Sequence, residues 1–182
     1  HRGICATMTH VKFPAEPMNI RPEIAALVPE MQAWRHHLHA YPETAFEETA
    51  TAAFVADKLR GFGLEVHEGL AGTGVVAALR AGGDGGEERA IGLRADLDAL
   101  HIHEATGLPH ASRTPGKMHA CGHDGHTAML LGAAKALAQT RRVAGTVYFI
   151  FQPAEENEGG GRVMVEQGLF RQFPMRAVYG MH

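Results

Sequence analysis

The segment GTVYFIFQ, residues 145–152, constrains the fold more than any other part of this 182-residue chain. It is a nearly continuous apolar run, rich in aromatic and β-branched residues, and this pattern is typical of a strand that is covered on both faces. Such a strand needs helices on both sides of its sheet, so the run predicts an α/β domain. The length favours one domain with a sizeable core over several small ones.

Two helices are predicted in the first third of the chain. Apolar residues recur every three or four positions over about 22–40, and Pro29 is expected to kink or restart this helix. Thr44 and Glu47 form a capping-box pattern ahead of a second periodic segment, which Gly61 helps to end. The chain is therefore expected to form two helices before its first strand.

Strands and helices alternate in the rest of the chain. Residues 74–80 and 89–96 flank a glycine-rich acidic loop, so we expect them to be neighbouring antiparallel strands. A buried helix is predicted over 126–137, a short helix over about 160–167, and a last strand over 177–182. This order predicts a layered α/β domain with a mixed central sheet flanked by helices.

Composition excludes several classes of partner and location. The formal net charge of -3 provides no basic field for phosphates, so no nucleic acid is expected as a partner. No apolar run approaches the ~18 residues of a membrane span, and the first twenty residues lack the continuous apolar segment of a signal peptide. Two cysteines cannot build a disulfide framework. We therefore expect a cytoplasmic protein with no membrane contact, and a disordered leader or cloning remnant at 1–18.

Chemically versatile side chains gather where the predicted strands end and where the buried helix begins. They are Asp96, Asp98, Cys121, His123, His126, Glu155, Glu156 and His182. Ligands of open α/β sheets bind beyond the carboxyl ends of the strands, so these side chains are expected to converge. Thiolate, imidazole and carboxylate together favour zinc or another late first-row divalent ion over magnesium or calcium. The sequence therefore predicts a metal site at this edge.

Each of these residues also has a simpler interpretation. Cys121 could be a small buried hydrophobe, His126 a polar residue that only supports the site, and Asp124 a helix N-cap. Asp96 could pair with Arg94 or with a backbone amide. Three further histidines, in the segment RHHLH, are interpreted as the exposed side of the first helix: His36, His37 and His39.

The adjacent Glu155 and Glu156 need a separate explanation. Neighbouring side chains in extended structure point to opposite sides, so the two carboxylates should have different roles unless the turn after Pro153 swings them together. One carboxylate could bind metal while the other moves protons, as metal-assisted hydrolysis requires. The simpler alternative is a solvated acidic loop.

From about residue 19 to the last residue, the chain resembles a known family. The segments LRADLDAL, GKMHACGHDGHTAMLLGAAKAL, GTVYFIFQPAEE and VYGMH are similar to the amidohydrolase branch of the aminoacylase-related metallopeptidases. That branch includes hippurate hydrolase, indole-acetyl-amino-acid hydrolases and bacterial N-acyl-amino-acid amidohydrolases. The resemblance implies a zinc-exopeptidase-like catalytic domain that cleaves the amide bond of an N-acyl amino acid or a short peptide.

The resemblance also implies a site with two divalent ions, manganese or zinc, with nickel or cobalt as alternatives. Carried over by position, four residues would be metal ligands: Cys121, His123, Glu156 and His182. Glu155 would be the general base and then the acid, and Asp98 would support the metal ligands from behind. The thiolate of Cys121 could bridge the two ions.

One expectation concerns the extent of the chain. Residues 19–182 correspond to the N-terminal part of the family's catalytic domain, without the lid and dimerisation domain and without a later histidine ligand. The resemblance therefore implies that the full-length form is a homodimer and that these residues alone are inactive. The alternatives are a non-catalytic metal-binding remnant and an exopeptidase or dipeptidase of the same family.

Overall fold

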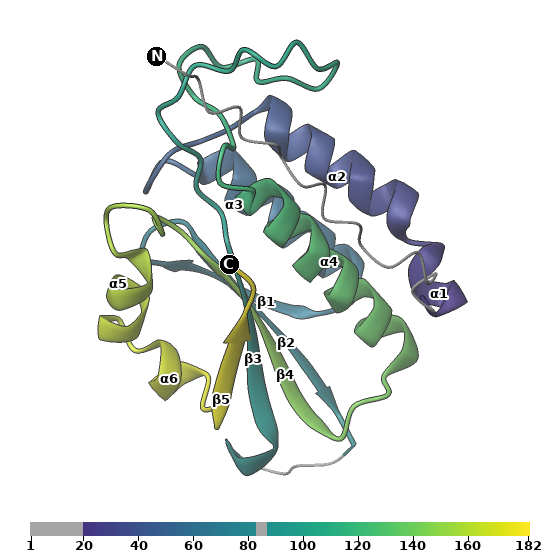
Figure 1. Cartoon of the computed structure of the whole chain (residues 1–182). Helices are drawn as coiled ribbons and strands as arrows, with labels where there is room; N and C mark the ends of the chain where they lie inside the picture. Colours follow the sequence, from purple (N-terminus) through teal and green to yellow (C-terminus); the bar gives the residue numbers. More distant parts are fainter. Residues whose placement is uncertain (1–19, 83–86) are drawn as a thin grey trace, which may run out of the picture.

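The computed structural model describes residues 20–82 and 87–182, so the predicted leader at 1–18 lies outside the described residues. Its centre is a mixed five-stranded sheet in the order β1-β2-β4-β3-β5 (Figure 1). The strands are β1 Glu65–Leu70, β2 Gly74–Ala81, β3 Ala90–Asp96, β4 Gly145–Gln152 and β5 Ala177–Gly180. The predicted fold class, a layered α/β domain with a mixed sheet, is confirmed.

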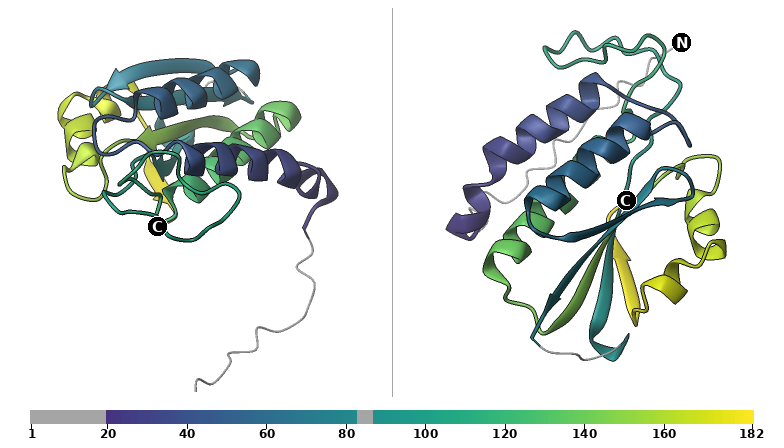
Figure 2. Two further views of the ribbon diagram at one scale, coloured as in Figure 1. Left: turned by 90° about the horizontal axis from the view of Figure 1, so that it is seen from above. Right: turned by 180° about the vertical axis from the view of Figure 1, so that it is seen from behind.

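Helices cover both faces of this sheet (Figures 1 and 2). They are α1 Pro22–Ala25, α2 Val28–Ala40, α3 Thr49–Gly61, α4 His123–Thr140, α5 Gly160–Glu166 and α6 Leu169–Gln172, with a 3-10 turn at Glu87–Arg89. The first predicted helix is two helices, because the chain restarts just before Pro29, which fits the first turn of α2. None of the described helices combines the length and apolar character needed to cross a membrane.

Strand β4 lies in the middle of the core, as its sequence predicts. Phe149 and Phe151 are 0% exposed and pack against α2, α3 and α4. Tyr148 and Ile150 point to the opposite face, where they pack with Met164 and other apolar residues of the α5–α6 region. Burial on both faces fixes the strand, so its carboxyl end and the turn after it have a defined position.

The prediction that residues 74–80 and 89–96 are neighbouring strands is wrong. Strand β4 lies between them, antiparallel to β2 and parallel to β3. The buried residues of β2 pair on their other side with β1, a largely exposed edge strand. The sequence of β1, EVHEGL, has little apolar character and gave no strand signal. A central strand with two partners was therefore mistaken for half of a hairpin.

The start of α3 also differs from its prediction. Thr44 does bond to Glu47, with Oγ1 donating to Oε2 at 2.9 Å, but this pair forms a turn ahead of the helix. The helix begins at Thr49, and its first amides donate to the carboxylate of Glu43, including the Thr51 amide at 2.7 Å. The side chain that satisfies the helix start is therefore an upstream glutamate.

Candidate metal centre

His123 lies at the centre of the candidate site. It is the first residue of α4, and its side chain is 0% exposed. Its Nδ1 lies 2.8 Å from the backbone oxygen of Asp98. Because a carbonyl oxygen can only accept, Nδ1 carries the hydrogen, and the neutral ring directs the lone pair of Nε2 away from the Asp98 carbonyl. Within residues 20–82 and 87–182, Nε2 has no hydrogen-bond partner.

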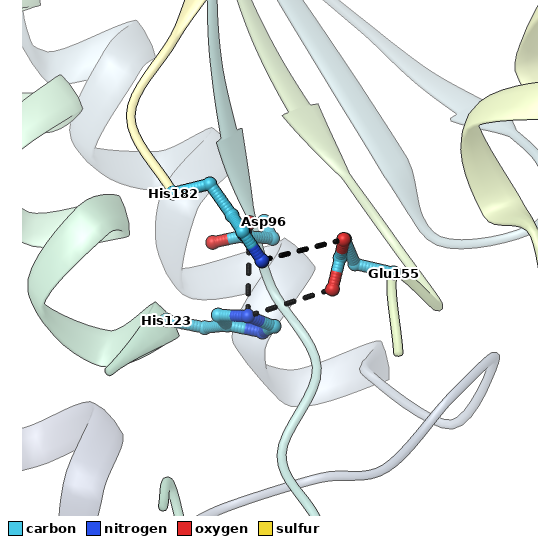
Figure 3. A group of neighbouring side chains, drawn as sticks. All are labelled: Asp96, His123, Glu155 and His182. Atoms are coloured by element: carbon cyan, nitrogen blue, oxygen red, sulfur yellow. Dashed lines mark ion pairs between the residues drawn. The ribbon is translucent and has the colours of Figure 1, made fainter. Parts of the chain in front are cut away.

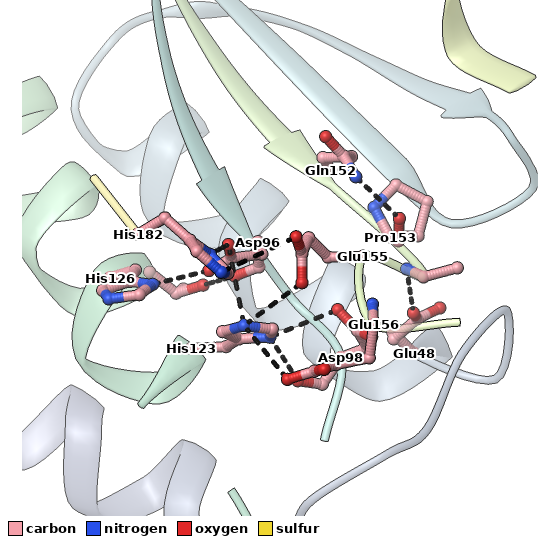
Figure 4. Close-up of polar contacts among 12 residues, drawn as sticks. Glu48, Asp96, Asp98, His123, His126, Gln152, Pro153, Glu155, Glu156 and His182 are labelled. Atoms are coloured by element: carbon pink, nitrogen blue, oxygen red, sulfur yellow. Dashed lines mark hydrogen bonds and ion pairs between the residues drawn. The ribbon is translucent and has the colours of Figure 1, made fainter. Parts of the chain in front are cut away.

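Three carboxylates from two strand ends face this free nitrogen, two of them drawn in Figure 3 and all three in Figure 4. The distances from His123 Nε2 are 3.7 Å to Asp96 Oδ2, 3.8 Å to Glu155 Oε2 and 3.9 Å to Glu156 Oε1. Asp96 ends β3, and the two glutamates follow β4. The predicted convergence at the carboxyl edge of the sheet is therefore present in the structure.

The turn after β4 explains how both glutamates reach the same point. Ala154 has a φ of +52°, a left-handed conformation that reverses the extended course of the chain. Glu155 and Glu156 lie in the turn that follows, at residues 155–158, so both approach His123 instead of pointing to opposite sides as they would in a strand. The Glu155 and Glu156 side chains are 24% and 25% exposed, so small molecules can reach part of each side chain.

The potential ligand atoms form two overlapping groups. One contains Cys121, His123 and Glu156, and the other contains Asp96, His123, Glu155 and His182. Within each group the atoms lie within 4.8 Å of one another. Since only Nε2 of His123 is free, this imidazole can coordinate one ion at a time. The predicted ligands Cys121, His123 and Glu156 thus come together directly, whereas His182 joins His123 through the second group.

Asp98 lies behind the ligands, where the sequence predicted a supporting residue (Figure 4). Its Oδ1 is 3.3 Å from His123 Nδ1, and its Oδ2 accepts the Glu156 amide at 3.2 Å. Burial alone would raise the pKa of Asp98, but the bonds to His123 and to the backbone of Glu155 and Glu156 outweigh it and lower the pKa. The aspartate is therefore ionised and contacts both sides of the site.

Asp96 is the residue of the second group that sequence reasoning did not select as a ligand. Its Oδ1 accepts from His126 Nδ1 at 2.7 Å, and its Oδ2 accepts from Arg94 at 2.9 Å. The alternative in which Asp96 pairs with Arg94 is therefore confirmed. Its Oδ2 is also 3.5 Å from His182 Nδ1. The sequence signal that could have identified Asp96 as a ligand was its position at the end of a predicted strand, two residues before Asp98.

Cys121 is exposed, so its interpretation as a small buried hydrophobe is wrong. The hydrogen bond to Glu156, followed by burial and the charges of nearby carboxylates, raises the pKa of the thiol to about 11. The pKa of His123 is also raised. Burial alone would lower this pKa, but the bond to Asp98 and the negative charge of Asp96 raise it above the usual value. Both pKa shifts favour the protonated forms, so a cation that binds the Cys121 thiolate and the His123 Nε2 lone pair competes with protons.

A second polar network lies on the other side of the start of α4. Asp124 is not an N-cap, since its Oδ2 accepts from His39 Nδ1 at 2.8 Å and from Arg35 Nε at 3.2 Å. The prediction that His39 is exposed is also wrong: it is 5% exposed, because its face of α2 packs toward α4. Nearby His119 is buried, and burial lowers its pKa to about 4.

The donor set fits a divalent cation. In the described part of the chain, the buried atoms His123 Nε2 and Glu156 Oε1 lie 3.9 Å apart and have no hydrogen-bond partner. Leaving such atoms unpaired is costly, and a cation between them would offset that cost. Thiolate, imidazole and carboxylate are ligands suited to zinc and related divalent ions.

A mixed sheet with these donors at its carboxyl edge defines an α/β domain with a candidate metal site. Residues 92–182, half of the chain, match the family described as Peptidase family M20/M25/M40. The chain belongs to this family.

Known relatives carry names that are consistent with this assignment. A hippurate hydrolase of Campylobacter jejuni is 48% identical over 165 residues, covering 91% of this chain and 42% of that protein. An N-acyl-L-amino acid amidohydrolase of Geobacillus stearothermophilus is 48% identical over 154 residues, covering 81% of this chain and 40% of that protein. The structure of a Bacillus subtilis protein described as a dinuclear metal binding peptidase from the M20 family matches with a TM-score of 0.80 at 41% identity, covering 87% of this chain and 43% of that one. The chain thus spans about two fifths of the length of these relatives.

The thiol of Cys121 leads to a prediction about pH. Its pKa of about 11 keeps it protonated at neutral pH in the metal-free chain. An ion that binds the thiolate displaces this proton, so zinc affinity is expected to increase with pH, by about tenfold per unit for each proton displaced. Calorimetric titrations between about pH 6 and 8 measure the slope. Cys121→Ala should flatten it, and an equally steep slope in that variant would contradict the prediction.

Proposed function

We propose that the protein containing this chain is a metal-dependent amidohydrolase that cleaves the amide bond of N-acyl amino acids. The observation that carries this proposal is the convergence of two glutamates from one turn on the free Nε2 of a buried histidine. Similarity to proteins named hippurate hydrolase and N-acyl-L-amino acid amidohydrolase supports the reaction and the class of substrate.

The proposed ligands are Cys121, His123, Glu156 and His182, which would hold two divalent ions, manganese or zinc, with nickel or cobalt as alternatives. The name of the Bacillus subtilis relative supports the number of ions. Bound ions supply positive charge that acidifies water and polarises the carbonyl of the amide. Asp98 acts behind the ligands: its contacts with His123 Nδ1 and with the Glu156 amide hold both in position.

Glu155 is proposed as the group that moves the proton. Its carboxylate is partly exposed and lies 3.8 Å from His123 Nε2, so it borders the site and is reached from solvent. Glu155 accepts a proton from the attacking water and then donates it to the nitrogen of the leaving amino acid. Its neighbour Glu156 lies instead in the other group of ligand atoms, with Cys121 and His123. The two adjacent carboxylates therefore have different roles.

Hydrolysis of N-benzoylglycine and other N-acyl amino acids tests the proposal, using the protein at the full length at which it is made. Activity is expected with these substrates, to be lost in a chelator, and to return when manganese or zinc is added. Free dipeptides are the comparison, because preferred cleavage of dipeptides would favour an exopeptidase instead. Metal binding without hydrolysis of either substrate class would favour a non-catalytic role.

A further inference from the structure

Glu48 is a buried carboxyl group that the proposed mechanism does not use. It precedes α3 and is 0% exposed, so it contacts neither solvent nor substrate. A buried carboxylate without partners is unfavourable, and burial does raise the pKa of Glu48. Its two oxygens are each bonded instead: Oε1 accepts the Ala154 amide at 2.9 Å, and Oε2 accepts the Thr73 hydroxyl at 2.6 Å.

The bond to Ala154 joins residues that are far apart in sequence, at a strained point. Ala154 is the non-glycine residue with φ +52° that turns the chain after β4, and it is fully buried. L-residues disfavour this conformation, so the surrounding structure must hold it. The same turn is closed by the Gly160 amide, which donates to the Ala154 oxygen at 2.9 Å. A side chain at Gly160 would lie 1.9 Å from the Pro153 oxygen.

This turn determines where the two site glutamates point. Glu155 and Glu156 follow Ala154 directly, and Figure 4 shows Glu48 beside the turn, with Glu156 on its other side. If Ala154 returned to an extended conformation, the turn at residues 155–158 that carries both glutamates would leave β4 in another direction, and the two carboxylates would no longer lie within 4 Å of His123 Nε2. The geometry of the candidate centre therefore depends on the conformation of one buried alanine.

We propose that Glu48 is a positioning residue, which holds the turn at Ala154 and thereby aims Glu155 and Glu156 at His123. The inference rests on the function proposed above for its effect on catalysis. Its effect on the turn itself does not depend on that function. Glu48 acts from behind the turn, through a backbone amide, and touches neither metal nor substrate.

The chain offers a matched control at the start of the same helix. Glu43 also accepts backbone amides, those of Ala50 and Thr51, but in the described part of the chain its side chain makes no hydrogen bond to the turn at 153–156. Glu43→Ala should therefore weaken the start of α3 without moving the site. Glu48→Gln keeps an oxygen for the Ala154 amide and an amide group that can donate to Thr73, so it is the conservative rescue.

Three readouts test the inference: hydrogen exchange at the Ala154 amide, zinc affinity and steady-state kinetics. Glu48→Ala is expected to expose the Ala154 amide to exchange, to weaken zinc binding by about 10-fold to 100-fold, and to lower kcat by about 100-fold. The KM should change by less than about threefold. Glu48→Gln should stay close to the unmodified protein in all three. Glu43→Ala should lower the Tm while leaving Ala154 protected and kcat within about threefold.

The outcomes separate this inference from the proposed function. If the unmodified protein hydrolyses no amide but Glu48→Ala still exposes Ala154 and weakens zinc binding, the function fails and the positioning role stands. Unchanged exchange at Ala154 in Glu48→Ala overturns the inference, and so does an equal loss of kcat in Glu43→Ala. If Glu48→Ala does not fold, Glu48→Asp withdraws the carboxylate by one methylene. Its Ala154 exchange should then increase, and unchanged protection overturns the inference.

Discussion

Replacing Glu155 by Gln is expected to lower kcat for hydrolysis of an N-acyl amino acid by at least about 1,000-fold, while zinc binding stays near normal. The amide has nearly the same shape as the carboxylate but cannot accept a proton from water. Glu155 is outside the Cys121–His123–Glu156 group, so the nearest set of ligands remains complete. Metal content by elemental analysis, measured beside kcat on the same preparation, checks both parts of the prediction.

The neighbouring residue provides the control. Glu156→Gln changes the same atoms one position along the chain, but Glu156 belongs to the group with Cys121 and His123. It should therefore weaken metal binding first, and added metal should restore part of the activity. If Glu155→Gln kept its turnover, Glu155 would not be the base. If both variants lost metal equally, the division of roles between the two carboxylates would be wrong.

Strand ends were the part of the site that the sequence predicted well. The apolar run at 145–152 identified β4 with its observed bounds, and the residues after it were placed correctly at the carboxyl edge of the sheet. This succeeds because a strand buried on both faces has a strong local pattern, and because ligands of such sheets bind beyond strand ends. His123 was placed there by its position at the start of a buried helix.

Contacts between distant segments could not be read from the sequence. His39 and Asp124 are far apart in the chain, and only the packing of α2 on α4 brings His39 Nδ1 to within 2.8 Å of Asp124. Without that packing, His39 is one of three similar histidines on a helix, and Asp124 has the local pattern of an N-cap. The pairing of β2 with β4 was not predicted for the same reason, since the short loop between β2 and β3 favoured β3 as the partner of β2.

The position of Ala154 shows a further limit. Its sequence, QPAEE, predicts a turn because of its proline but does not indicate a left-handed alanine. The side chain that holds this conformation, Glu48, is 106 positions away in the sequence, and the same segment contains two other glutamates, Glu43 and Glu47. Local pattern could therefore raise the question of whether the two glutamates converge, and only the fold answered it.

Among the proposed substitutions, replacement of His123 should have the largest effect on metal binding. Replacement by Asn is the sharpest change, because the Asn side-chain amide can still donate to the Asp98 carbonyl in place of Nδ1 but has no counterpart of Nε2. Zinc affinity is expected to fall by at least about 1,000-fold, more than the 10-fold to 100-fold typical of a supporting residue such as Asp98 in Asp98→Asn. His123 is the only residue shared by both groups of ligand atoms in the described chain, so no alternative group remains intact.

Calorimetric zinc titration of His123→Asn and Asp98→Asn, together with a histidine control, measures this ranking. His103→Ala suits the control because it removes an exposed imidazole from the loop after β3. It should leave the affinity unchanged, which would show that zinc is not bound by scattered surface histidines. A thermal melt of the metal-free variants separates loss of a ligand from loss of the fold. The Tm of His123→Asn should be close to the Tm of the unmodified chain. Zinc affinity that persisted in folded His123→Asn would mean that the ion binds elsewhere, because every group of ligand atoms at this edge of the sheet includes Nε2 of His123.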